Sequence, residues 1–208
     1  MKKSILNLLT VAGTAACVSV AVAAPQSFDF KDPKGVNNAV FKLDAPLEAI
    51  SGSANGVSGT VTFDAAKPAA TTGKIIIASK SLTVGNPMMK DHMHGAQWLD
   101  VAKHPEISFE TKELKNVKTE GDVTTADAVG TFTLKGVAKE LTIPVRLTYL
   151  KDKLGARSNG QMQGDLLVIR STFTIKRGDF NIQPGQNEDK VANDIELTLS
   201  IAGASPKQ

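Results

Sequence analysis

The chain has 208 residues, of which 41% are hydrophobic and 22% charged, with a formal net charge of +3 and a single cysteine. A chain of this size buries most of the surface that its unfolded form exposes, so it needs no disulfide to fold. Charges of both signs are interspersed and only 5% of the residues are aromatic. Nucleic-acid binding usually requires a clustered basic face with stacking aromatic side chains, so nucleic acid is excluded as a partner.

The N-terminal segment predicts export. Two lysines precede a long apolar run, which ends in small residues of the kind that signal peptidases recognise. We therefore expect residues 1–23 to be a cleaved signal peptide, residues 24–208 to form one mature domain, and the protein to reside in the periplasm. The alternatives are a retained membrane anchor and a lipoprotein with a lipidated Cys17. Because Cys17 is the only cysteine, the mature chain can form no disulfide.

Strand patterns follow a lead-in arm that contains Pro and Gly, at about residues 25–38. Alternating or β-rich runs predict a first strand over 40–43, with 47–50 as its continuation past Pro46, and further strands over 57–63, 74–84, 106–114, 126–134, 140–150, 163–176 and 191–202. The run 163–176 is apolar on both faces, which predicts a bulge or a covering loop or helix. Short strands joined by turns indicate an all-β domain, either a closed barrel or a sandwich.

The clearest pattern is a hairpin between Gly130 and Tyr149. Along its second arm every odd position from Leu141 to Tyr149 is apolar, and the even positions hold polar residues or proline. A period of two places one face in a dry interior and the other in water. The Lys135-Gly136 link supplies the positive φ that a tight hairpin turn requires.

The stretch 86–103 is the one helical candidate. Its apolar residues recur near helical spacing after an Asn86-Pro87 pair, which can cap and start a helix. Gly95 would weaken or split this helix. In a barrel with a single short helix, we expect that helix to cover an open end, with Trp98 and Leu99 as the apolar cover.

His92, Met93 and His94 offer a metal-binding alternative. In an exported protein, His with Met suits copper, and His with a carboxylate suits zinc. Residues two apart on a helix point in different directions, however, so the competing interpretation is packed methionines beside solvated histidines. Nucleophilic catalysis has little support, because the sequence holds no G-x-S-x-G motif and the mature chain no cysteine. We expect neither enzyme activity nor a cofactor.

Four short segments stand out by their order and spacing. They are WLDVAKHPEISFE at 98–110, GTFTLKGVAKELTIPV at 130–145, FTIKRGDFNI at 173–182 and VANDIELTLSI at 191–201. Together they resemble the YceI-like family of periplasmic lipid- or polyisoprenoid-binding proteins, over about residues 38–203. The sequence departs from the family pattern at Asn38-Ala39, where the family often has His-Ser, and at Asn181, where it has Gly.

The resemblance implies an extended, lipocalin-like antiparallel β-barrel of about eight strands whose lumen holds a long amphiphile such as an isoprenoid quinone. It implies a long-chain isoprenoid or fatty lipid as partner, with transient membrane contact, for a monomer or homodimer. Independently, eight strands enclose room for packed side chains or for one slender ligand. An enzyme acting on a bound isoprenoid would need titratable side chains in the lumen. Almost none occur at the strand positions that are expected to face inward.

Strand parity identifies the residues expected to line the lumen. The same side chains would also fill a ligand-free core, so the pattern leaves both interpretations open. The candidates are Phe41, Phe63, Ile75, Ile77, Ile107, Phe109, Phe132, Leu141, Ile143, Val145, Leu147, Phe173, Leu197 and Leu199.

Overall fold

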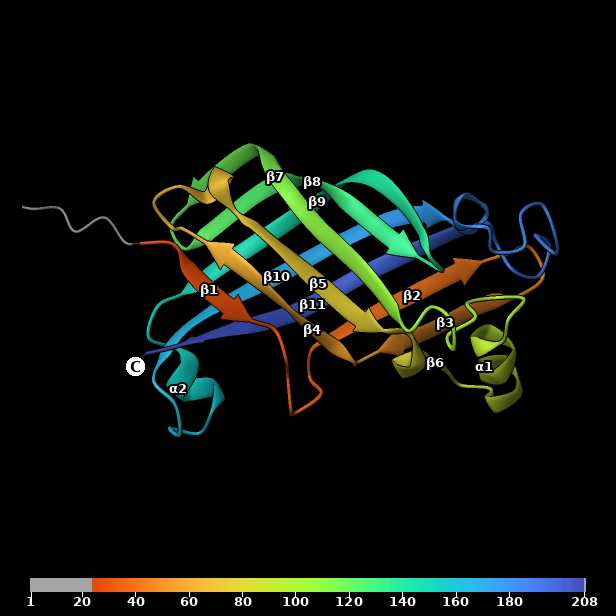
Figure 1. Ribbon diagram of the computed structural model, residues 1–208, viewed down its shortest axis with the longest axis horizontal. Coiled ribbons are helices and arrows are strands. Elements are labelled where there is room, and N and C mark those ends of the chain that lie inside the picture. The colour runs from red at the N-terminus through yellow and green to blue at the C-terminus, as the bar shows by residue number, and fades with distance from the viewer. Residues whose placement is uncertain (1–23, 208) are drawn as a thin grey trace, which may run out of the picture.

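The computed structural model describes residues 24–207, so the expected signal peptide and Cys17 lie outside the described residues. The described chain forms one antiparallel sheet of eleven strands that closes on itself (Figure 1). The strands are β1 (Gln26–Asp29), β2 (Asn38–Asp44), β3 (Ala49–Ala54), β4 (Val57–Phe63), β5 (Thr72–Ala78), β6 (Thr83–Val84), β7 (Glu106–Glu120), β8 (Val123–Leu134), β9 (Val137–Leu150), β10 (Gly164–Lys176) and β11 (Asp194–Pro206).

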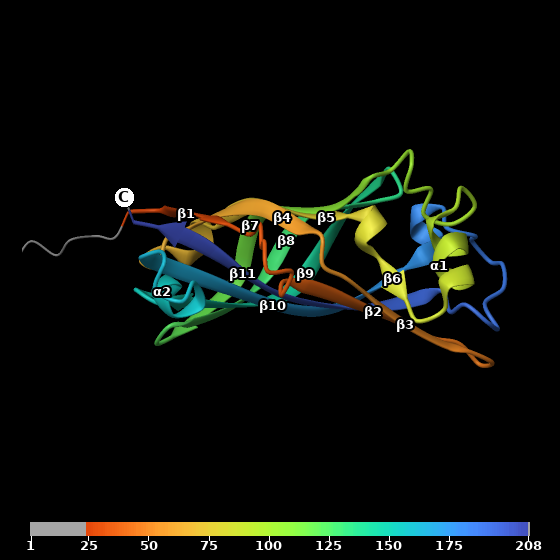
Figure 2. The ribbon, with the colours of Figure 1, turned by 90° about the horizontal axis from the view of Figure 1, so that it is seen from below.

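Eight of these strands form the closed wall, in the order β1-β4-β5-β7-β8-β9-β10-β11, with Asp29 paired to Ala204 across the closure. The N-terminal part of β11 pairs with β2 instead, and β2 continues to β3 and β6. These three strands therefore extend the sheet beyond the closed wall, toward the end where α1 lies (Figure 2). The prediction of an all-β, lipocalin-like barrel of about eight strands is confirmed.

Three strand predictions were wrong in detail. Residues 47–50 do not continue the strand before them, because the Ala45 amide donates to the Glu48 carbonyl in a turn and β3 pairs antiparallel with β2. The expected lead-in arm contains β1, which pairs with both β4 and β11 and buries Phe28 completely. The expected strand over 74–84 is interrupted by a 3₁₀ turn, η2 (Ser79–Ser81). The Ser79 amide donates to the carbonyl of Pro105, while the Ser81 hydroxyl donates to that of Ala78. The first bond keeps the chain beside the start of β7 and the second closes the turn, after which β6 pairs with β3.

The predicted helix is shorter than the stretch 86–103. The helix α1 (Pro87–His94) starts where the Asn86 side chain accepts hydrogen bonds from the amides of Met88 and Met89. It ends at Gly95, whose backbone is extended, and turns follow to residue 103. The predicted capping pair and the predicted break at Gly95 are both confirmed.

A second, four-residue helix explains the strand that is apolar on both faces. The helix α2 (Leu154–Arg157) packs against β10 and buries Leu154 at 2% exposure. The ladder from β10 to β11 runs without a register shift from Gly164 to Lys176. Cover by a helix, rather than a bulge, therefore accounts for the apolar residues of this strand. Two further 3₁₀ turns are η1 (Pro68–Ala70) and η3 (Arg177–Phe180).

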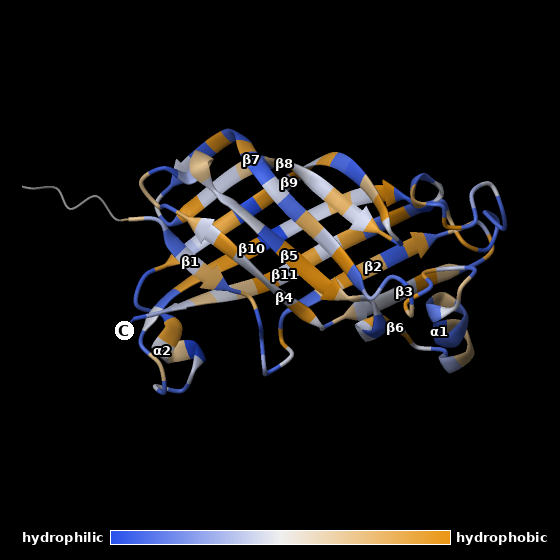
Figure 3. Cartoon of the chain, viewed as in Figure 1, coloured by the Kyte–Doolittle hydropathy of each residue, from blue (hydrophilic) through white to orange (hydrophobic). Residues whose placement is uncertain are grey.

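The hairpin of β8 and β9 forms as the sequence predicts. Lys135 and Gly136 have φ values of 49° and 74°, which suit a two-residue turn with both central residues left-handed. Polar and apolar residues alternate along the wall strands in Figure 3. The apolar residues point inward and form two buried clusters, one around Phe28 and Leu167 and one around Phe132 and Phe180.

In the part of the chain that the structure describes, no helix has both the length and the apolar character needed to cross a membrane.

Candidate functional site: an apolar cavity with a polar end

The barrel is hollow. A cavity of about 490 Å³ lies inside it. Strands around the barrel form its walls, and residues of α1 line its edge. Small-molecule sites typically have volumes of roughly 300 to 1,000 Å³, so this interior is large enough for a ligand. The structure therefore favours a hollow interior, partly open to the surface, over the competing interpretation of a solid core.

Most of the predicted lumen residues line this cavity. Phe63 packs instead against Tyr149, with ring centroids 6.0 Å apart, and Leu141 packs against both buried clusters. Contact of any of these side chains with a ligand stays a prediction. The twelve that line the wall are Phe41, Ile75, Ile77, Ile107, Phe109, Phe132, Ile143, Val145, Leu147, Phe173, Leu197 and Leu199.

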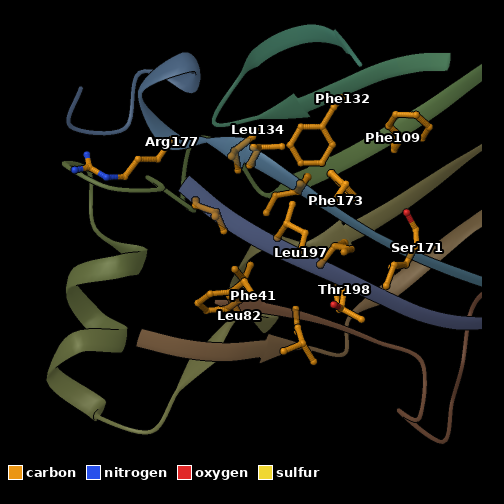
Figure 4. Close-up of a pocket in the computed structure, with 18 of the residues that line it drawn as sticks. Phe41, Leu82, Phe109, Phe132, Leu134, Ser171, Phe173, Arg177, Leu197 and Thr198 are labelled. Atoms are coloured by element: carbon orange, nitrogen blue, oxygen red, sulfur yellow. The ribbon is translucent and has the colours of Figure 1, made fainter. Parts of the chain in front are cut away.

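A glycine on β3 makes room for one of these aromatic rings. A Cβ atom at Gly52 would lie 2.3 Å from the Phe41 ring and 2.3 Å from the carbonyl oxygen of Thr83. Any side chain at this position would therefore displace either the ring or strand β6. In Figure 4 the Phe41 ring lies beside Leu82, across from Phe132 and Phe173.

The residues around α1 extend the site beyond the predicted set. Met88 and His92 of α1 line the cavity, as do Trp98 and Leu99 from the turns that follow. Trp98 and Leu99 pack against the cluster around Phe132, as expected for a cover. Glu48, at the tip of the β2–β3 hairpin, also lines the cavity. Strand parity missed these residues because they lie outside the strands of the closed wall.

Arg177 is the largest fully buried side chain, at 1% exposure. Its guanidinium lies 5.8 Å from the centroid of the Trp98 ring and donates to five backbone carbonyls. Burial lowers the pKa of this group from its ordinary value, and nearby Glu188 partly offsets the effect. Among residues 24–207 it forms no ion pair with a carboxylate, so carbonyl dipoles supply most of its close polar contacts, beside the Trp98 ring and the more distant charge of Glu188. The accepting carbonyls belong to Ile182, Gln183, Gln186, Val191 and Ala192.

Polarity is distributed unevenly along the cavity. The ionisable side chains in its wall are Glu48, His92 and Arg177. His92 belongs to α1, Arg177 lies over the Trp98 ring in the turns after α1, and Glu48 lies in the β2–β3 turn, which Figure 2 shows at the α1 end. Farther in, the polar groups are hydroxyls such as those of Ser171 and Thr198, which Figure 4 shows at the opposite side from Arg177. The cavity is thus apolar over most of its length and charged at one end, which is the pattern that an elongated amphiphile requires.

Comparison with known proteins identifies the family. The model of the YceI-like domain matches residues 30–202. The chain belongs to the YceI-like domain family. A relative from Yersinia pestis, named UPF0312 protein, is 32% identical over 156 residues, which cover 75% of this chain and 74% of the relative.

Solved structures share the fold of this YceI-like domain. Burkholderia cenocepacia BcnA has a TM-score of 0.62 at 22% identity, covering 80% of this chain and 94% of BcnA. A polyisoprenoid binding domain from Saccharophagus degradans also has a TM-score of 0.62, at 10% identity, covering 88% of this chain and all of that domain. At these identities the likeness establishes the fold alone.

The α2 end of this YceI-like barrel is sealed by an aromatic and polar cluster. Phe28 meets Tyr149 edge-on at 6.3 Å between ring centroids, and the Tyr149 hydroxyl donates to Asp165 at 2.6 Å. Burial and this bond raise the pKa of Tyr149 to about 12. Burial alone would raise the pKa of Asp165, but bonds from the Asp152 amide and the Tyr149 hydroxyl outweigh it and lower that pKa.

The structure gives no support to the metal alternative. His92 and Met93 line the cavity, whereas the Nε2 atom of His94 lies 2.9 Å from the carbonyl oxygen of Leu82. Over the described range 24–207, no group of three His, Cys, Asp or Glu side chains is arranged to hold a metal ion. His94 is therefore engaged apart from the two cavity-lining residues of the predicted cluster.

Proposed function

We propose that this protein is a non-catalytic periplasmic carrier that holds a long-chain isoprenoid or another long lipid in its lumen. The apolar tail would extend toward the sealed α2 end, and the polar head would lie near α1. The observation that carries the proposal is the apolar cavity of about 490 Å³ whose ionisable residues lie at the α1 end. The shared fold with a domain described as polyisoprenoid binding supports the same ligand class.

The energetics suit a carrier that exchanges lipid with membranes. Each methylene buried in an apolar site contributes about 0.8 kcal/mol, so ten of them contribute roughly 8 kcal/mol before entropic losses. This corresponds to micromolar affinity at best, and a longer tail would be held more tightly. Spontaneous release of a long tail into water is therefore slow, and release requires an apolar acceptor.

The cavity wall shows no paired catalytic groups among its described residues. His92 and Glu48 could act as acid or base, but neither side chain is hydrogen-bonded to a hydroxyl of the wall, and the guanidinium of Arg177 is engaged with backbone carbonyls. The hydroxyl of Ser171 donates to the carbonyl of Pro144 at 2.6 Å. General acid–base or nucleophilic catalysis needs a reactive group beside a positioned base, so this arrangement supports binding alone.

Native mass spectrometry of protein purified from the periplasm, followed by organic extraction, tests the proposal. We expect a co-purified lipid of isoprenoid type, lost on extraction and regained on incubation with lipid. Ala128→Leu adds side-chain volume to the cavity wall and should abolish lipid recovery. Thr131→Leu changes the opposite face of β8 and is the matched control. Absence of lipid in the wild type, or equal loading of both variants, would contradict the proposal.

A further inference from the structure

Three cations form a row across the outer face of the barrel wall. The strand register aligns Lys118 of β7 with Thr125 of β8, Thr125 with Arg146 of β9, and Arg146 with Arg170 of β10. All three cationic residues are exposed. Adjacent strands are about 4.8 Å apart, so the row extends over roughly 14 Å.

Two arginines in this row face one another directly. Arg146 and Arg170 are Cα partners, and like charges opposite one another in a sheet are destabilising. Within the described chain, neither arginine nor Lys118 takes part in an ion pair. Arg170 donates to the carbonyls of Ile169 and Ile201, and Arg146 donates only to the Thr148 hydroxyl at 3.3 Å. A guanidinium has five donors, so both retain capacity for an external acceptor.

The row lines a groove of about 520 Å³ on the outer surface. Asp127 is the one carboxylate among the residues that line it, and it accepts a hydrogen bond from the Asn116 amide at 2.6 Å. Asn116 has a φ of 52° and lies where the β7–β8 register shifts, so the irregularity places this amide over Asp127. The groove therefore carries three cations against one carboxylate.

The groove lies over a seam in the barrel wall. The ladder between β9 and β10 runs from Leu150 and Leu166 to Arg146 and Arg170, and the paired arginines are its last rung. Beyond this rung, β9 continues with Val145 and Pro144, and Pro144 has no amide hydrogen to donate to β10. Val145 and Ser171 line both this groove and the interior cavity. These two residues are therefore part of the wall between the outer groove and the lumen.

We propose that this groove binds the phosphate groups of an anionic phospholipid membrane, so that the barrel docks with the β9–β10 seam against the bilayer surface. The spacing supports a surface rather than a single ion, because a row of about 14 Å is longer than one phosphate group. No aromatic residue is among those that line the groove, which disfavours stacking with nucleic-acid bases. The interaction is separate from the lipid held in the lumen.

Flotation with lipid vesicles tests this proposal. The vesicles contain phosphatidylcholine alone or with phosphatidylglycerol, without isoprenoid, and the protein is used both as purified and after lipid extraction. Each cation near an anionic surface contributes about fivefold to partitioning, so Lys118→Gln/Arg146→Gln/Arg170→Gln should lose at least about tenfold. The control Lys31→Gln/Lys67→Gln/Lys74→Gln removes the same charge from exposed positions elsewhere and should lose less than about twofold.

Binding by the wild type should require phosphatidylglycerol and weaken as salt is added. Equal losses in the two triple variants, with both still folded by circular dichroism, would overturn the proposal. A second result would also overturn the proposal: the wild type does not float with anionic vesicles, yet inorganic phosphate raises its melting temperature. The groove would then bind a free anion and not a membrane. If the protein binds vesicles but never carries lipid in its lumen, the membrane-docking proposal stands and only the proposed carrier function is contradicted.

Discussion

The two ends of the barrel are built by different means. At the α2 end, Phe28, Tyr149 and Asp165 come from strands of the closed wall. The Tyr149 hydroxyl donates to Asp165, which also accepts from the Asp152 amide in the turn after β9. At the α1 end, the buried charge of Arg177 depends on carbonyls of the loop between η3 and β11. The sealed end is therefore as stable as the sheet, whereas the order of the polar end depends on one side chain. This difference suits a site that must hold a tail firmly and still admit it.

Removing Arg177 should have the largest effect of any single change. Arg177→Met keeps the apolar stem but leaves several carbonyls without a donor, and each unsatisfied buried group costs about 1–3 kcal/mol. We expect the free energy of unfolding to fall by at least about 3 kcal/mol, measured by urea denaturation. Hydrogen exchange should locate the loss in residues 177–193.

Arg146→Met is the control for this change, because it removes an exposed arginine of the same size. Its effect should remain within about 0.5 kcal/mol. If both variants lose equal stability, the carbonyl cradle is not what orders the polar end.

Tyr149→Phe tests the sealed end. The variant keeps the ring against Phe28 but leaves the Asp165 carboxylate without one of its donors. We expect a loss of about 1–2 kcal/mol in the free energy of unfolding, with lipid retention unchanged. Faster lipid release from this variant, measured by transfer to acceptor vesicles, would contradict the assignment of this end as sealed.

The long strands of the closed wall could be predicted from the sequence, but the β1 strand that completes the sealed end could not. The alternation from Leu141 to Tyr149 specifies a strand and its inward face, because the side-chain period of a strand is two. The strand β1 escaped prediction because four residues between prolines carry too little pattern. Its pairing with both β4 and β11 depends on contacts remote in sequence.

The polar half could be predicted only in part. The Asn86-Pro87 pair and Gly95 specified where α1 begins and ends, and Asn181 takes the left-handed conformation that its residue type tolerates, with a φ of 55°. Arg177 has no such local signal. In the sequence it is one charge in a turn-like segment, and its burial results from carbonyls brought around it by the fold.

Acid should weaken the sealed end through Asp165. Its pKa is lowered in the folded state, so its contribution to stability is complete above the pKa of the unfolded chain, near 4. The contribution is lost as the pH falls through the lower pKa of the folded protein. The difference in unfolding free energy between the wild type and Asp165→Asn should therefore shrink below about pH 4. A constant difference from pH 7 to pH 3 would contradict this.

The smallest effect on global stability is expected at the N-terminus of α1. Asn86→Ala removes the acceptor for two amides and costs the helix about 1 kcal/mol, but α1 buries no residue completely, so the barrel should keep its melting temperature. Because Met88 and His92 of this helix line the cavity, fraying should speed lipid transfer to acceptor vesicles severalfold. Asn86→Asp keeps a capping oxygen and should behave like the wild type. A transfer rate that stays constant while hydrogen exchange reports a frayed α1 would mean that lipid leaves by another route, and the seam between β9 and β10 is the place to look for it.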